Sequence, residues 1–367
     1  MNDLHPLPMP AQILRGMHPP GAATVPNPVP EAAAMPWALA SWDQYDALAR
    51  RLAHPFEGHY RRQAFDYVHP EHLQPRAPAR YRRPYPVRVS YLAWGDPSRP
   101  LLVCCGGVAN VARRFDYLAL ALADEHYVVC PDWVGRGESG WVHDQGDYSH
   151  ATCVEQLRQL LVHLGDRPAS IIGSSLGATI GIELAAMLAP GRIARLVLND
   201  TGPHIPAGTR SWRAATLARH YVFRSPADMF RRVGAAQKND GPLPDEVRLH
   251  NIHAQTRWSD EEGGRIFRHD PRALQEYQEH ARSSADVWDS WDAIACPVLV
   301  TRGTETDFLL PQTLQRMQAK RSVTVMHVPA TGHTPALADP NHIACIRDWL
   351  RDAAHFAAEF SSGYALR

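Results

Sequence analysis

Short apolar runs, mostly without polar alternation, recur along the chain from about residue 87 onward. Runs of this length and composition are typical of strands that are buried on both faces, as in a parallel sheet. Seven such runs cover residues 87–94, 101–105, 127–130, 169–174, 195–200, 297–303 and 323–329. Stretches of helical period lie between them, for example at residues 113–124, 148–164, 176–189 and 340–356. The alternation predicts the α/β class, with a mostly parallel sheet covered by helices on both faces.

The alternation breaks once, between about residues 203 and 290. This stretch has helical character and is rich in aromatic side chains, namely Trp212, Tyr221, Phe223, Phe230, Trp258, Phe267, Tyr277 and Trp288. Because it is too long for a loop between two strands, we expect residues 203–290 to form a small helical cap. The flanking residues 87–202 and 291–357 would then form one core domain.

The first part of the chain differs from the core in composition. Residues 1–36 contain nine prolines and only three charged side chains, so we expect residues 1–40 to be disordered. Residues 41–86 follow as a helix and a connector. The helix is expected to begin at Ser41 and to dock on the core domain through an apolar stripe, made of Trp42, Tyr45, Leu48 and Leu52.

Seven arginines and three acids make residues 57–88 locally basic. This segment fits either a contact with an anion or a polymer surface, or a solvated connector anchored to the core by its aromatic side chains. The second interpretation is favoured because the chain as a whole has no basic excess.

The overall composition excludes several classes of function. Lys and Arg number 38, as do Asp and Glu, so the formal net charge is zero and no nucleic-acid partner is expected. The chain has no apolar run of about eighteen residues and no secretory signal at its start, which predicts no membrane span and a cytoplasmic location. Six cysteines without a CxxC pair predict free thiols rather than a disulfide framework or a thiolate zinc site.

A GxSxG motif stands at the junction of a predicted strand and a predicted helix, as Gly173-Ser174-Ser175-Leu176-Gly177. Small residues on both sides of Ser175 permit the tight, strained turn that exposes a nucleophile at a helix N-terminus. The alternative is that Ser175 only caps the helix. The setting between strand and helix favours the nucleophile.

A serine nucleophile needs a base that is held by an acid. His333 follows the last predicted strand and is the candidate base. The acid should lie between the serine and the histidine in chain order, after a strand end. Asp307 fits this position best, with Asp200 and Glu305 as rivals.

Two backbone N–H groups should stabilise the oxyanion that forms when the serine attacks a carbonyl. One is the N–H of Leu176, directly after the nucleophile. The other is expected in the loop Cys105-Gly106-Gly107-Val108, from Gly107 or alternatively from Val108.

With these motifs in place, the chain resembles the α/β-hydrolases of the capped, lipase- and esterase-related kind. The matching segments are residues 131–139, 173–177, 198–203 and 332–333, in the family's order. The resemblance covers about residues 87–357 and implies an α/β-hydrolase sheet with the helical cap inserted after the sixth strand. It also implies a Ser175, Asp307 and His333 triad and an acyl-enzyme intermediate. In one departure, Cys105 stands where the family usually has a histidine before the glycine of the oxyanion loop.

Two other motifs in the sequence are typical of cofactor or metal sites. Residues 135–140 match the GxGxxG pattern of dinucleotide sites, but no helix is expected to follow them and Asp132 would repel phosphates, so no cofactor is predicted. His250 and His253 have the spacing of metal ligands on a helix, but no acid or cysteine cluster lies near them in sequence, so no metal is predicted.

The predicted function is a cofactor-independent serine hydrolase acting on an ester, or a related acyl compound, of small to medium size. One alternative is hydrolytic cleavage of a carbon–carbon bond in a diketone-like acid, with Arg113 or Arg114 binding the carboxylate. Acyl transfer to an alcohol would use the same triad. From another class comes a ligand-binding protein on a hydrolase scaffold without activity. The sequence leaves the oligomeric state open.

Overall fold

The computed structural model describes residues 39–237 and 240–362. The segment predicted to be disordered, residues 1–40, therefore lies almost entirely outside the described residues. No helix of the described part is long and apolar enough to cross a membrane.

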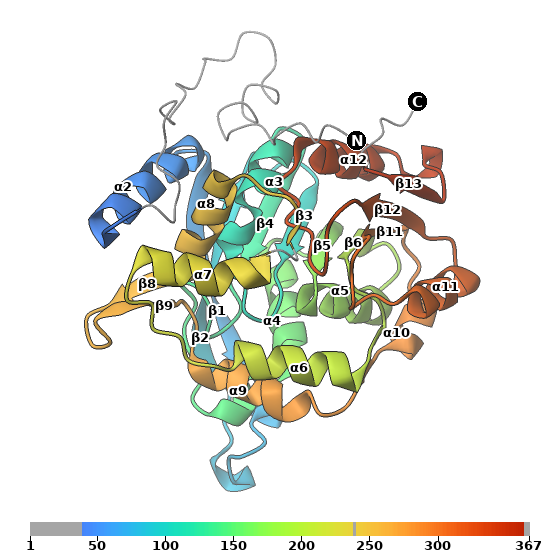
Figure 1. Ribbon diagram of the computed structural model, residues 1–367. Coiled ribbons are helices and arrows are strands. Elements are labelled where there is room, and N and C mark those ends of the chain that lie inside the picture. Colours follow the sequence, from blue (N-terminus) through green and yellow to red (C-terminus); the bar gives the residue numbers. More distant parts are fainter. Residues whose placement is uncertain (1–38, 238–239, 363–367) are drawn as a thin grey trace.

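A nine-stranded sheet forms the centre of the molecule (Figure 1). In spatial order its strands are β1 (Tyr60–His69), β2 (Tyr85–Trp94), β4 (Tyr127–Pro131), β3 (Leu101–Cys105), β5 (Ala169–Ser174), β6 (Ile193–Asn199), β11 (Val298–Gly303), β12 (Thr324–Val328) and β13 (Glu359–Ser361). Strand β2 pairs antiparallel with β1 and β4, and every other pair in this sheet is parallel. The prediction of a mostly parallel α/β sheet is confirmed, and all seven apolar runs correspond to strands.

Helices cover both faces of this sheet. One apolar core contains side chains of α3 (Asp116–Leu122) and α12 (Pro340–Arg351). The opposite core contains side chains of α4 (His150–His163), α5 (Leu176–Met187), α10 (Trp288–Ala293) and α11 (Pro311–Lys320). Successive strand residues alternate between the two cores; Cys104 belongs to the first and Cys105 to the second. Burial on both faces explains why the strands read as continuous apolar runs.

The insertion between β6 and α10 is less uniformly helical than predicted. Its elements are β7 (His204–Ile205), α6 (Ala207–Leu217), α7 (Pro226–Gln237), α8 (Asp245–Gln255), β8 (Thr256–Ser259), β9 (Gly264–Phe267), α9 (Pro271–His280) and β10 (Ala285–Asp286). Strands β8 and β9 form one antiparallel pair, and β7 and β10 form another. The second pair joins the two ends of the insertion, so the segment leaves and re-enters the core domain at one place.

The N-terminal helix α2 (Trp42–Ala53) begins after Ser41, as predicted, but it docks elsewhere than expected. Its buried Tyr45, Leu48 and Leu52 share an apolar cluster with Leu249 and Ile252 of α8. Figure 1 shows α2 beside α8. The prediction that this helix packs on the core domain is therefore wrong, because its apolar stripe completes the insertion.

The arginine-rich connector contains a strand that the sequence analysis missed. Strand β1 runs antiparallel to β2 at the edge of the sheet, and its burial pattern is mixed rather than uniformly apolar. Arg76, farther along the connector, pairs with Glu276 and Glu279 of α9. This arginine of the segment therefore serves a contact within the chain.

Candidate active site

A sharp turn places Ser175 between β5 and α5. Its backbone angles are φ 52° and ψ −114°, in the left-handed region that a residue with a side chain rarely adopts. Ser175 is the residue before the helix, yet its side chain makes no capping hydrogen bond within the described structure. The strained turn therefore presents a hydroxyl that the helix does not use, as a nucleophile elbow requires.

The preceding serine is used differently. Ser174 is 3% exposed, and its hydroxyl accepts a hydrogen bond from Asn199 Nδ2 at 3.2 Å. Ser175 is half-buried and keeps access to solvent. The two adjacent serines therefore differ in burial, and Ser175 is the more accessible one.

Both glycines of the motif are required by close backbone approaches. A Cβ on Gly173 would lie 2.4 Å from the carbonyl oxygen of Gly177, and a Cβ on Gly177 would lie 2.3 Å from that of Cys105. A side chain at either position would collide with the backbone, so β5, α5 and the end of β3 can pack this closely only with glycine there.

We expect Gly177→Ala to destabilise the protein by about 1–3 kcal/mol, the usual cost of overpacking, because the added methyl would collide with the backbone of β3. Gly208→Ala is the matched control, since a Cβ at Gly208 has nothing within 4 Å. Urea denaturation of both variants measures the difference. Equal midpoints for the two variants would contradict the close-approach argument.

A buried acid and histidine pair lies at the carboxyl edge of the same sheet. His333 Nδ1 is 3.0 Å from Asp200 Oδ2, and these residues are 5% and 0% exposed. Asp200 also accepts hydrogen bonds from the N–H of Gly303 and the hydroxyl of Thr306. Asp200 follows β6 and has a φ of 51°, which turns the chain at the strand end. The pair leaves Nε2 as the ring nitrogen that can take a proton from a substrate or nucleophile.

Asp307 does not hold His333, so this part of the predicted triad is wrong. Its side chain is 65% exposed and pairs with Arg213 of α6. Glu305, the other rival, is exposed as well. The loop after β11 turns Thr306 inward, between these two acids, and the Thr306 hydroxyl reaches Asp200. Asp200 was a weighed alternative, and it occupies the place that the sequence analysis assigned to Asp307.

Asn199 joins the elbow to the histidine loop, a role that the sequence analysis did not find. Its Nδ2 donates to Ser174 Oγ and, at 2.9 Å, to the carbonyl oxygen of Pro335. Its Oδ1 accepts a hydrogen bond from the Thr301 hydroxyl at 2.6 Å. The residue before Ser175 and the residue two after His333 thus contact one buried amide, which brings the two loops together.

Burial sets the protonation state of the pair. Burial lowers the pKa of His333, and the nearby Arg213 guanidinium lowers it further. The charge of Asp307, the hydrogen bond with Asp200 and the charge of Asp240 oppose this shift. Burial also raises the pKa of Asp200, opposed by the hydrogen bonds from Thr306 and Gly303. A lowered histidine pKa keeps the imidazole neutral at neutral pH, the form in which it can act as a base.

We expect the acid limb of the pH profile of kcat/KM to have its midpoint below about 6.5, the ordinary histidine value. The sign follows from the base form: activity is present above the pKa of His333 and disappears as pH falls through it. Initial rates with a neutral aryl ester between pH 4 and pH 8 measure this limb, with protein stability checked at each pH. A midpoint above 7 would contradict the burial argument.

The oxyanion loop is fixed by hydrogen bonds on several sides. Trp133 Nε1 donates to the carbonyl of Gly106, and Arg136 Nε donates to that of Val108, each at 2.9 Å. The Gly107 N–H donates to Asn110 Oδ1 at 2.9 Å. A Cβ built on Gly107 would lie 3.4 Å from Ser175 Cβ, so this loop borders the serine.

These contacts bear on the predicted oxyanion donors. The Gly107 N–H is already engaged by Asn110, whereas the Val108 N–H has no hydrogen-bond partner among the described residues. Leu176 is the first residue of α5, where the helix leaves the N–H without an internal partner. Among the described residues, the N–H groups of Leu176 and Val108 are therefore free of partners, whereas that of Gly107 is not.

The GxGxxG segment holds the carboxylate of Asp132 where a phosphate would have to bind. Asp132 accepts hydrogen bonds from the N–H groups of Ala112 and Glu138. A Cβ on Gly137 would lie 2.2 Å from that carboxylate. The first α-helix after this segment begins at His150, ten residues beyond its last glycine. The segment is therefore a loop that packs around the Asp132 carboxylate.

The two histidines with ligand spacing on α8 contact different acids. His250 Nε2 is 3.0 Å from Asp116 Oδ2, and His253 Nε2 is 3.5 Å from Asp46 Oδ1. Within the described ranges, no group of three or more His, Cys, Asp or Glu residues is placed to hold a metal ion. The helix does not bring these histidines to one site.

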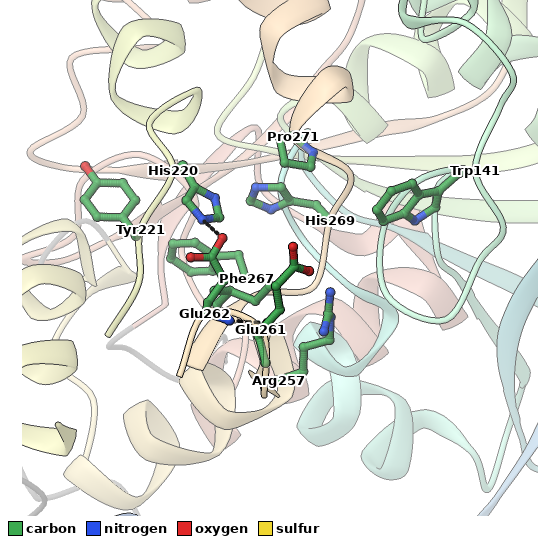
Figure 2. A pocket seen from close by; sticks show the side chains of 11 residues that line it. Trp141, His220, Tyr221, Arg257, Glu261, Glu262, Phe267, His269 and Pro271 are labelled. Carbon is green, nitrogen blue, oxygen red and sulfur yellow. Dashed lines mark hydrogen bonds and ion pairs between the residues drawn. The ribbon is translucent and has the colours of Figure 1, made fainter. Parts of the chain in front are cut away.

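Figure 2 shows a pocket of about 190 Å³ that involves the insertion. It is lined by Trp141, His220, Tyr221, Arg257, Ser259, Glu261, Glu262, Ile266, Phe267, His269 and Pro271. His220 Nε2 and Glu262 Oε1 are within hydrogen-bond distance, 2.9 Å, at its wall. None of the residues around Ser175 and His333 lines it, so this pocket is separate from the elbow.

The two arginines considered for a substrate carboxylate both have acid partners in the chain. Arg113 Nε is 2.8 Å from Asp116 Oδ2, and Arg114 Nη2 is 2.8 Å from Asp240 Oδ1. The Arg114 and Asp240 side chains are only 8% and 11% exposed, so their pair is closed to solvent. The acid partner of Arg113, Asp116, is only 1% exposed, so neither arginine has a solvated counterion that a ligand could replace.

The sheet with its elbow after β5 defines the fold class, and comparison with known proteins identifies the family. The model of the Alpha/beta hydrolase family matches residues 102–343. The chain belongs to the alpha/beta hydrolase family.

Individual relatives agree with this assignment. The chain is 32% identical over 266 residues to a 3-hydroxybutyrate-oligomer hydrolase from Cupriavidus necator, covering 70% of this chain and 90% of that protein. It is 28% identical over 232 residues to an esterase from Mycobacterium tuberculosis, covering 61% and 72%. The crystal structure of an alpha/beta hydrolase from Novosphingobium aromaticivorans has a TM-score of 0.67 at 27% identity, covering 80% of this chain and 98% of that one.

Proposed function

We propose that this chain is a serine hydrolase of carboxylic esters, with Ser175 as nucleophile, His333 as base and Asp200 as the acid that orients His333. The observation that carries the proposal is the strained, uncapped Ser175 at the same sheet edge as the buried pair of His333 and Asp200. The names of the relatives, an oligomer hydrolase and an esterase, support an ester as the substrate.

The mechanism follows from these positions. His333 Nε2 takes the Ser175 proton as Oγ attacks the ester carbonyl, while Asp200 stabilises the imidazolium through Nδ1. The N–H groups of Leu176 and of the Gly107–Val108 turn stabilise the oxyanion. The imidazolium then protonates the leaving alcohol, and water activated by the same histidine releases the acid from Ser175.

In this proposal, residues 203–290 act as a cap that covers the site, and α6 reaches the core near His333 through Arg213 and Asp307. Small and medium-sized acyl groups are the expected substrates. Because the relative from Cupriavidus necator is named for 3-hydroxybutyrate oligomers, short linear esters of this hydroxy acid are the first natural candidates to test.

A panel of p-nitrophenyl esters with acyl chains of two to about twelve carbons tests the proposal, together with 3-hydroxybutyrate dimers and trimers. We expect saturable hydrolysis that a fluorophosphonate abolishes. A purified, folded protein that hydrolyses no member of the panel would contradict the proposed function.

A further inference from the structure

Arg213 of α6 places a positive charge beside the proposed base. Its guanidinium carbon lies 5.4 Å from the centroid of the Phe308 ring. The Phe308 ring in turn stacks on His333, with 3.7 Å between the ring centroids and an angle of 22° between the planes. Arg213 and His333 therefore both contact the Phe308 ring.

The hydrogen bonding of Arg213 is incomplete. Its Nη2 pairs with Asp307 Oδ1, but its buried Nε has no partner among the described residues. The Arg213 side chain is only 16% exposed, whereas that of Asp307 is 65% exposed. The donors of this guanidinium are therefore not all used inside the protein, and an unused buried donor costs free energy.

The pair of Arg213 and Asp307 differs from the other charged pair near His333. Arg114 and Asp240 are both almost fully buried, so each neutralises the other inside the protein. Asp307 is largely solvated, so another anion can replace it as the partner of Arg213 at small cost. Of these two arginines, Arg213 is thus the one whose counterion a ligand could replace.

A cation at this place would hinder catalysis if nothing compensated it. The reaction converts His333 into an imidazolium, and a nearby positive charge opposes that change. A carboxylate on the substrate would balance the charge of Arg213 in the complex. In the complex that carboxylate would replace Asp307 at Arg213 Nη2, through a charge-assisted hydrogen bond.

From this geometry we infer that Arg213 forms an anion subsite, so that the enzyme prefers esters that carry a free carboxylate, with Asp307 as the counterion in the unliganded protein. This inference rests on the proposed ester hydrolysis at Ser175 and adds a substrate class to it. Linear oligomers of a hydroxy acid, which end in a free carboxylate, belong to this class.

A matched pair of substrates tests the subsite. The 3-hydroxybutyrate dimer carries a carboxylate, and the same dimer with its terminal carboxyl group converted to a primary amide has nearly the same shape without the charge. We expect the wild-type kcat/KM for the acid to exceed that for the amide by about 10- to 100-fold, the factor that one charge-assisted hydrogen bond gives.

Three variants separate the subsite from a structural role. In Arg213→Gln the ratio of acid to amide should fall close to one, mainly through loss of the acid. In Asp307→Asn the ratio should hold or rise, because the competing carboxylate is removed. Arg210→Gln, on the same helix but bonded to the carbonyl of Ser283 at 2.7 Å, is the matched control and should keep the wild-type ratio.

Each other outcome has a definite meaning. If Arg213 and Asp307 only fasten α6 to the core, both variants should impair the acid and the amide alike, and the inference would be overturned. A wild-type ratio near one would also overturn it, while leaving ester hydrolysis intact. If neither dimer nor any aryl ester is cleaved, the proposed function itself fails. Thermal melting shows whether each variant is folded. A further variant, Arg213→Lys, keeps the charge and should retain part of the acid-to-amide ratio.

Discussion

Replacing Ser175 with alanine should lower kcat for a p-nitrophenyl ester by about 10⁴- to 10⁶-fold, because the covalent route is lost. The fold should persist, since the half-buried hydroxyl makes no capping bond and its removal leaves no buried partner unpaired. Steady-state kinetics and a thermal melt of the purified variant measure the two effects.

Ser174→Ala is the matched control for this experiment. Ser174 lies one residue earlier, is buried and accepts a hydrogen bond from Asn199. Its loss should cost stability rather than several orders of magnitude in turnover. If Ser175→Ala kept a tenth of the wild-type rate, the nucleophile would have to be another residue.

The second large effect is expected at the acid. Asp200→Asn should lower kcat by about 10⁴-fold with little change in KM, because an amide would offer an N–H to His333 Nδ1 and favour the wrong tautomer. Asp200 and His333 are joined at 3.0 Å inside the protein, so solvent cannot replace the carboxylate. Kinetics with a neutral aryl ester separate kcat from KM.

Asp307→Asn provides the comparison, since the sequence offers both aspartates as the acid that orients His333. Asp307 is solvated and pairs with Arg213, so its substitution should change the turnover of a neutral ester by at most several-fold. If Asp307→Asn were the more damaging change, Asp307 and not Asp200 would be the acid that orients His333.

The sequence predicts the sheet well because of how its strands are buried. A strand covered on both faces, such as β3 (Leu101–Cys105), is apolar at every position, and that pattern is visible without a structure. The edge strand β1 contacts the core on alternate residues near its end and carries charged side chains elsewhere, so its pattern resembles a connector. Its pairing with β2 depends on a partner that local sequence does not specify.

The site divides in the same way. Ser175 and His333 are marked by local motifs, a GxSxG turn and a glycine–histidine loop after a strand. The acid is not, because Asp200 and Asp307 both follow strands and both precede His333. What decides between them is the turn of each loop: a φ of 51° at Asp200 and an inward Thr306 that leaves Asp307 in solvent. The stripe on α2 likewise indicates a packed helix without naming the surface that it packs on.

The central claim is that His333 and Asp200 activate Ser175. Fluorophosphonate labelling, followed by intact mass measurement and peptide mapping, tests it most directly. The account predicts a single adduct on the peptide that contains Ser175, formed rapidly in the wild-type protein and in Asp307→Asn, far more slowly in Asp200→Asn, and not at all in Ser175→Ala. An adduct on any other residue, or equal labelling rates in Asp200→Asn and the wild type, would contradict it.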